Sequence, residues 1–184
     1  MTVSFLNVNA KNLPRGLRNN NPGNLRISNI KWQGKIPNSQ NTDKAFEQFS
    51  NLHFGLRAML TDVANDITVK KLDTLTKLIN SYAPPTENDT VNYINFVRKS
   101  TGLTPNQTIK LTPDLLQKIV KAKILIENGA ATVNKLLPNI DQLINTAVTD
   151  LNEATKKRIN WKKAAGGAGL LFAAFVAFFF IIRK

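Results

Sequence analysis

The sequence predicts a mainly α-helical fold that ends in a membrane-spanning segment. Three observations lead to this prediction. Apolar residues recur at helical spacing from about residue 52 to residue 160, with interruptions at polar or proline-containing stretches. Turn-forming residues dominate the first 50 positions, where no long periodic run occurs. Residues 164–182 carry no charge, and this segment is about as long as a helix that crosses a hydrocarbon core.

The chain is expected to have four parts. Residues 1–13 form an N-terminal arm and residues 14–132 a helical domain. Residues 133–160 form an amphipathic helical linker, and residues 161–184 form a C-terminal transmembrane anchor. A chain of 184 residues has room for one domain of ordinary size beside such an anchor.

The apolar periodicity of residues 14–132 predicts four helices, of which two precede a pair of prolines. These two helices cover about residues 52–66 and 72–82. Pro84 and Pro85 must end the second helix, because proline lacks a backbone N–H and restricts the residue before it.

The other two helices have start and stop signals at their ends. Asp89 or Thr90 can accept a hydrogen bond from the first turn of the third helix, and Gly102 closes that helix. The fourth helix has Pro113 in its first turn, where proline is favoured, and runs to Glu127 just before an Asn-Gly pair.

The segment 133–160 keeps apolar residues at helical spacing, with a kink at Pro138. We expect it to be a stalk, a helix lying on a membrane or the seam of an oligomer. Its periodic stretch is too short to predict a coiled coil.

The anchor, residues 164–182, has a pair of basic residues at each end. Trp161 sits where an interfacial aromatic side chain belongs. A buried core helix is the alternative, which the basic flanks and the apolar residues on every helix face disfavour. Basic residues at both ends leave the orientation in the membrane open.

The amino-acid composition limits the kinds of partner and functional site that the chain is expected to have. The formal net charge of +13 indicates an anionic partner, which can be phospholipid, a cell-wall polymer or nucleic acid. The chain has no cysteine and a single histidine, His53. We therefore expect neither a metal site nor a cofactor, and a Ser-His-Asp or Cys-His mechanism is disfavoured.

Asparagines surround a turn in residues 15–26, whose sequence is RGLRNNNPGNLR. Pro-Gly within this segment is a turn signal. Carboxamides both donate and accept hydrogen bonds, so they suit the hydroxyl and N-acetyl groups of a sugar. An Asn-rich surface loop is the alternative. The candidate ligand-binding carboxamides are those of Asn19, Asn20, Asn21 and Asn24.

Two of the glutamates are candidates for a general acid. Glu87 lies in a loop stiffened by Pro84 and Pro85, and the alternative is an ordinary loop acid beside a helix cap. Glu127 ends an apolar helix, where the helix dipole disfavours an acid. Apolar surroundings favour the protonated carboxyl group that a general acid needs. The alternative for Glu127 is a poorly placed helix-end acid.

The motifs, in this order, resemble those of a phage virion protein family. The matching segments are RGLRNNNPGNLR at 15–26, WQG at 32–34, FEQF at 46–49, FGLRA at 54–58, YAPPTENDT at 82–90 followed by Tyr93, and IENG at 126–129. Members of this family are often described only as structural proteins of the particle. The matched motifs add five substrate-binding candidates, namely Arg18, Trp32, Tyr82, Asn88 and Tyr93.

Some of these motifs are also similar to lysozyme-type peptidoglycan hydrolases, the glucosaminidases and lytic transglycosylases. In those enzymes the helix with the catalytic Glu precedes the Asn-containing and Trp-x-Gly segments, whereas here the Glu127 helix follows them. The resemblance therefore implies a lysozyme-like helical domain with circularly permuted elements. It makes Glu127 the general acid, with Glu87 as its rival. A lytic transglycosylase can work with one Glu, which fits a chain with few acids.

The expected function is that of a membrane-anchored, virion-associated enzyme of a bacteriophage. It would cleave peptidoglycan as a lytic transglycosylase or muramidase when the phage breaches the cell wall. The alternative is a catalytically inactive, membrane-anchored minor structural protein of the virion that binds glycan or capsid. A basic membrane protein that contacts the packaged genome is the third hypothesis.

The expected partners follow from these hypotheses. They are peptidoglycan glycan strands, the lipid membrane of a phage virion and other virion proteins. Nucleic acid is disfavoured, because no basic motif interleaved with aromatic residues accompanies the positive charge.

Overall fold

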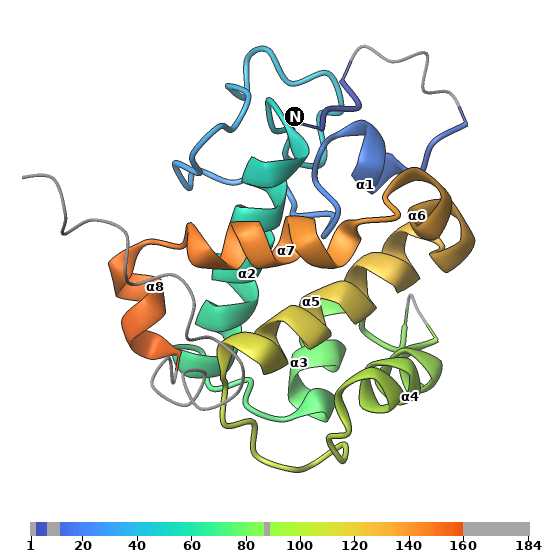
Figure 1. Cartoon of the computed structure of the whole chain (residues 1–184), viewed down its shortest axis with the longest axis vertical. Coiled ribbons are helices and arrows are strands. Elements are labelled where there is room, and N and C mark those ends of the chain that lie inside the picture. Colours follow the sequence, from blue (N-terminus) through green and yellow to red (C-terminus); the bar gives the residue numbers. More distant parts are fainter. Residues whose placement is uncertain (1–2, 7–11, 87–88, 160–184) are drawn as a thin grey trace, which may run out of the picture.

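A computed structural model of the chain describes residues 3–6, 12–86 and 89–159 (Figure 1). The described residues form helices and no strand, and only two isolated antiparallel bridges join loop residues. The prediction of a mainly α fold is confirmed for this part of the chain. The helices in chain order are α1 (Arg15–Arg18), α2 (Leu52–Thr68), α3 (Leu75–Tyr82), α4 (Thr90–Thr101), α5 (Pro113–Asn128), α6 (Ala130–Leu136), α7 (Ile140–Thr149) and α8 (Glu153–Arg158).

The four longer helices that were expected are present, and side-chain caps fix their starts. Thr112 accepts a hydrogen bond from Leu115 N–H at the start of α5, and Asp89 accepts one from Asn92 N–H at the start of α4. Helix α3 begins three residues later than expected, because Thr74 caps it. Gly102 and Gly129, with φ of 75° and 76°, follow the last residues of α4 and α5.

Helix α5 is the centre of the packing. It contacts α1, α2, α4, α6 and α7 (Figure 1). Its side chains at Leu116, Ile119, Val120 and Ile124 are fully buried. They belong to one apolar cluster that extends from α1 to residue 159, so the described helices share one core.

Residues 133–159 lie in this core and do not form a separate stalk. Helices α6, α7 and α8 replace the single kinked helix that was expected, and Pro138 lies between α6 and α7. Helix α7 packs on both α2 and α5, with Ile144 1% and Val148 2% exposed. The apolar face that suggested a membrane or oligomer contact is therefore covered by the chain's own helices.

The predicted membrane-spanning segment, residues 164–182, lies outside the described residues. Among the helices that are described, none is long and apolar enough to cross a bilayer. The anchor therefore stays a prediction.

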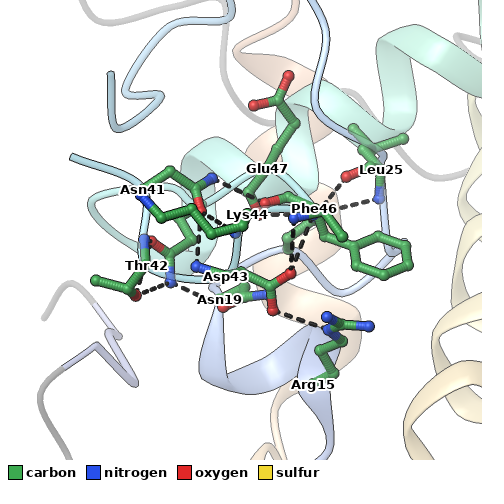
Figure 2. A network of polar contacts seen from close by, with 12 residues as sticks. Arg15, Asn19, Leu25, Asn41, Thr42, Asp43, Lys44, Phe46 and Glu47 are labelled. Atoms are coloured by element: carbon green, nitrogen blue, oxygen red, sulfur yellow. Dashed lines mark hydrogen bonds and ion pairs between the residues drawn. The ribbon is translucent and has the colours of Figure 1, made fainter. Parts of the chain in front are cut away.

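Polar side chains fix the loop before α2 onto α1 (Figure 2). Asp43 Oδ2 accepts hydrogen bonds of 2.8 Å from Arg15 Nε and from Asn19 Nδ2, and Asp43 Oδ1 accepts one of 3.0 Å from Phe46 N–H. Burial by itself raises the pKa of Asp43, but the bonds from Arg15, Asn19 and Phe46 together lower it to about 2. This loop is therefore stabilised by an ionised carboxylate.

Replacement of Asp43 by Asn should remove an acid-sensitive part of the stability. The carboxyl group titrates at about 2 in the folded chain and near 3.8 in the unfolded one, so its contribution is complete above pH 4 and is lost as the pH falls toward 2. The variant should be less stable by about 1 kcal/mol at pH 7 in urea unfolding. At pH 2.5 the difference from the parent chain should shrink, and a difference that stays constant would contradict this role.

Candidate functional site

Three of the predicted carboxamides are buried within the fold and are not available to a ligand. Asn19 is 4% exposed, and Asn20 and Asn21 are 0% exposed. Asn21 Nδ2 donates to the carbonyl oxygens of Leu25 and Glu47, both at 2.9 Å. The structure thus differs from the expectation for these three residues: their side chains satisfy internal polar groups and shape the turn.

Asn24, the fourth carboxamide, meets Glu127. Asn24 Nδ2 donates to Glu127 Oε2 at 2.9 Å, although the two residues are 103 positions apart in the chain. The Tyr93 hydroxyl donates to Glu127 Oε1 at 3.1 Å. Each carboxylate oxygen of Glu127 therefore accepts one hydrogen bond. Asn24 also has a φ of 48°, in the left-handed region that asparagine tolerates better than most residues.

The residues next to this pair hold the turn against the end of α5. Asn128 Nδ2 donates to Pro22 O at 2.8 Å and to Ile124 O at 3.0 Å. A Cβ atom on Gly16 would lie 2.4 Å from Asn128 Oδ1 and 3.1 Å from Asn24 Oδ1. Position 16 therefore requires glycine for this close approach.

Asn24 and Glu127 open onto a groove of about 470 Å³, which we call the Glu127 groove. Its volume is in the range of ligand-binding pockets. Three of its residues, Trp32, Phe46 and Tyr82, are aromatic, and Asp62 on α2 is a second acid. The full set of lining residues is Asn24, Leu25, Arg26, Ser28, Ile30, Trp32, Phe46, Asp62, Ser81, Tyr82, Ala83 and Glu127.

The structure thus brings Asn24, Trp32, Tyr82 and Glu127 together, as the motifs suggest, and leaves other candidates apart. Tyr93 is 5% exposed, so it supports Glu127 from within the fold and does not face the groove.

Two further candidates are not part of the groove wall. Arg18 is exposed and does not line the groove. Glu87 and Asn88 lie outside the described residues. Their proposed roles therefore stay predictions.

A buried lysine lies behind the groove. Lys123 is 1% exposed, and its Nζ atom is 3.3 Å from the ring centre of Tyr82. Burial lowers the pKa of Lys123 to about 8, against the attraction of Asp62, Asp66 and Glu127. Burial, and then the neighbouring Asp66, raise the pKa of Asp62. The groove is therefore backed by a cluster of charges of both signs.

Asp62 and Lys123 were not among the site residues predicted from the sequence. Each follows a buried apolar residue by three positions on its helix, Asp62 after Met59 and Lys123 after Val120. Lys123 is also four positions before Glu127, so the two share a helix face. The sequence does show that both charged residues interrupt the apolar faces of their helices, and this pattern could have predicted a buried charge cluster.

Replacement of Lys123 by Met should remove a pH dependence of stability in the alkaline range. The lysine pKa is about 8 in the folded chain and 10.5 in the unfolded one. Between these values the unfolded chain binds more protons, so the lysine's contribution to stability rises with pH. Urea unfolding from pH 7.5 to pH 10 should show the parent gaining about 2 kcal/mol relative to the variant. A difference that is flat across this range would show that burial does not lower the pKa of Lys123 in the folded chain.

The chain is similar in sequence to a known phage protein. No protein-family model matches the chain. Protein P5 of Pseudoalteromonas phage PM2 is 36% identical over 119 residues, which are 63% of this chain and 72% of that protein. The expected relation to a phage protein is thereby confirmed, and the lysozyme-like relation stays a prediction. This chain belongs to the family of Protein P5 of Pseudoalteromonas phage PM2.

Proposed function

We propose that this chain is a component of a phage particle and that it binds the glycan strands of peptidoglycan in the Glu127 groove. The observation that supports this best is the pairing of Asn24 with Glu127 beside Trp32 and Tyr82. Carboxylates and carboxamides hydrogen-bond sugar hydroxyl groups, and aromatic rings pack on the apolar faces of sugar rings. The relation to a phage protein supports the particle as the setting.

Cleavage of the glycan, by a lytic transglycosylase or muramidase mechanism, is the second candidate. It is favoured by a carboxyl group within reach of a ligand in the groove, because a glycosidic oxygen must be protonated as it leaves. A second acid, Asp62, lines the same groove. Both Glu127 oxygens, however, already accept hydrogen bonds, from Asn24 and Tyr93, so a glycosidic oxygen would have to displace or share a donor. We therefore place binding before cleavage.

The circularly permuted, lysozyme-like arrangement is part of this proposal. In the permuted order, the helix with the acid follows the Asn-rich segment in the chain but must lie beside it in space. The hydrogen bonds from Asn24 to Glu127 and from Asn128 to Pro22 O support that arrangement.

Asn24→Ala tests the proposed binding. The variant removes a polar group of the groove and a donor to Glu127, so the Kd for a peptidoglycan tetrasaccharide should rise about tenfold in calorimetry. The full chain is used in mild detergent, which keeps residues 133–159, part of the core, in place. Asn134→Ala is the matched control, since Asn134 is exposed on α6, outside the groove. Equal affinities of the parent and Asn24→Ala would overturn the proposal.

The same preparations separate binding from cleavage. Glu127→Gln keeps the shape of the side chain and removes the proton that a general acid transfers. If the parent releases muropeptides, this variant should do so at least about 10²-fold more slowly. A parent that binds glycan and releases nothing supports the binding function alone. A cleaving parent whose activity survives Glu127→Gln would exclude Glu127 as the acid and make Glu87→Gln the next variant.

We also propose that residues 164–182 anchor the chain in the lipid membrane of the particle. Truncation after Asn160 keeps every described helix and the buried Ile159. The truncated chain should stay in the supernatant when phospholipid vesicles are sedimented, whereas the full chain should sediment with them. If the truncated chain still sediments completely with the vesicles, the anchor assignment is wrong.

A further inference from the structure

A second hollow, of about 450 Å³, lies between α2, α8 and the segment at residues 30–33, and we call it the basic hollow. The side chains that line it include three cations and no acid. The complete set is Ile30, Lys31, Trp32, Gln33, Phe54, Arg57, Ala58, Thr61, Asn65, Asn152, Ala154, Thr155 and Arg158.

The three cations differ in how they are held. Arg57 Nε donates to the backbone oxygen of Asp150 at 2.9 Å and lies 3.2 Å from the Asp150 carboxylate, so Arg57 has a fixed place and a compensating charge. Arg158 donates to Asn65 Oδ1, a neutral acceptor. Among the described residues, no carboxylate pairs with Lys31 or Arg158. The hollow therefore has an excess of positive charge available to a ligand.

The basic hollow and the Glu127 groove share a wall. Ile30 and Trp32 line both of them, so the two cavities are neighbours. The two cavities differ in charge. The charged residues of the groove are the acids Asp62 and Glu127 and the cation Arg26, whereas all three charged residues of the hollow are cations. A ligand that fills both must offer neutral hydrogen-bonding groups at one end and anionic groups at the other.

We propose that the basic hollow binds the carboxylates of the short peptide that branches from a peptidoglycan glycan strand. This inference rests on the proposed binding of the strand itself in the Glu127 groove. Peptidoglycan combines neutral sugars with peptides that carry free carboxylates, so one molecule supplies both kinds of group at neighbouring positions. The hollow would thereby distinguish peptidoglycan from a peptide-free glycan of the same sugars.

The test compares two ligands on the full chain in mild detergent, by calorimetry. One is a peptidoglycan tetrasaccharide with its peptides, and the other is the same tetrasaccharide after an amidase has removed them. The parent should bind the peptide-bearing form about tenfold more tightly, as expected for one charge-assisted hydrogen bond. The double variant Lys31→Gln, Arg158→Gln should lose this preference and keep the affinity for the peptide-free form.

The matched control is Lys99→Gln with Lys157→Gln, which removes the same charge at exposed positions that do not line the hollow. The control should keep the tenfold preference. Equal binding of the two ligands by the parent, or a preference that survives the double variant, overturns this inference and leaves the groove proposal intact. If neither ligand binds, the proposed function itself fails and the inference fails with it.

A membrane surface is the competing source of negative charge. Vesicles that contain phosphatidylglycerol are therefore a third probe. They are used without detergent on chains truncated after Asn160, which keep every described helix and lack the proposed anchor. If the double variant loses vesicle binding relative to the control variant, while its preference for the peptide-bearing glycan is unchanged, the hollow binds lipid phosphate and the peptide assignment is overturned.

Discussion

The contact between the Asn-rich turn and the C-terminal end of α5 is the constraint on which the groove depends. Buried Asn side chains complete the hydrogen bonding of backbone groups that a turn of this shape cannot pair by itself. Asn128 ties the turn to α5, and Gly16 leaves room for that approach. Since Asn24 and Glu127 meet only across this contact, the residues that determine the local fold also determine the geometry of the site.

The helices were predictable where their signals are local. Capping residues such as Thr112 and the glycines at 102 and 129 act within one turn of the chain, so the sequence alone reveals the helix ends. The segment 133–159 was not predictable in the same way. Amphipathic spacing shows that a helix has an apolar face, but not whether a membrane, a second chain or the same domain covers it. Here α2 and α5 cover the face of α7.

At the site, too, the sequence predicted the chemistry of the side chains better than their positions in space. The resemblance of the motifs predicted Asn24, Trp32, Tyr82 and Glu127 as candidate site residues, and the structure places all four on the wall of one groove. The same motifs did not show that the side chains of Asn19, Asn20 and Asn21 are buried. A carboxamide has the same donors and acceptors whether it meets a sugar or a backbone carbonyl, and only burial separates the two cases. Asp62 and Lys123 were missed because their partnership spans two helices.

Lys123 explains how the groove can hold two acids. A fully buried lysine with a lowered pKa costs stability, and an apolar residue of similar length would avoid that cost. Asp62 and Glu127 place two acidic side chains on the wall of one groove. The ammonium group of Lys123 attracts both carboxylates from behind the groove wall. Lys123 thus interrupts the apolar pattern of α5 at a cost in stability, and this cost is offset by its attraction to the acids of the groove. Such exceptions to a local sequence pattern are expected at functional sites.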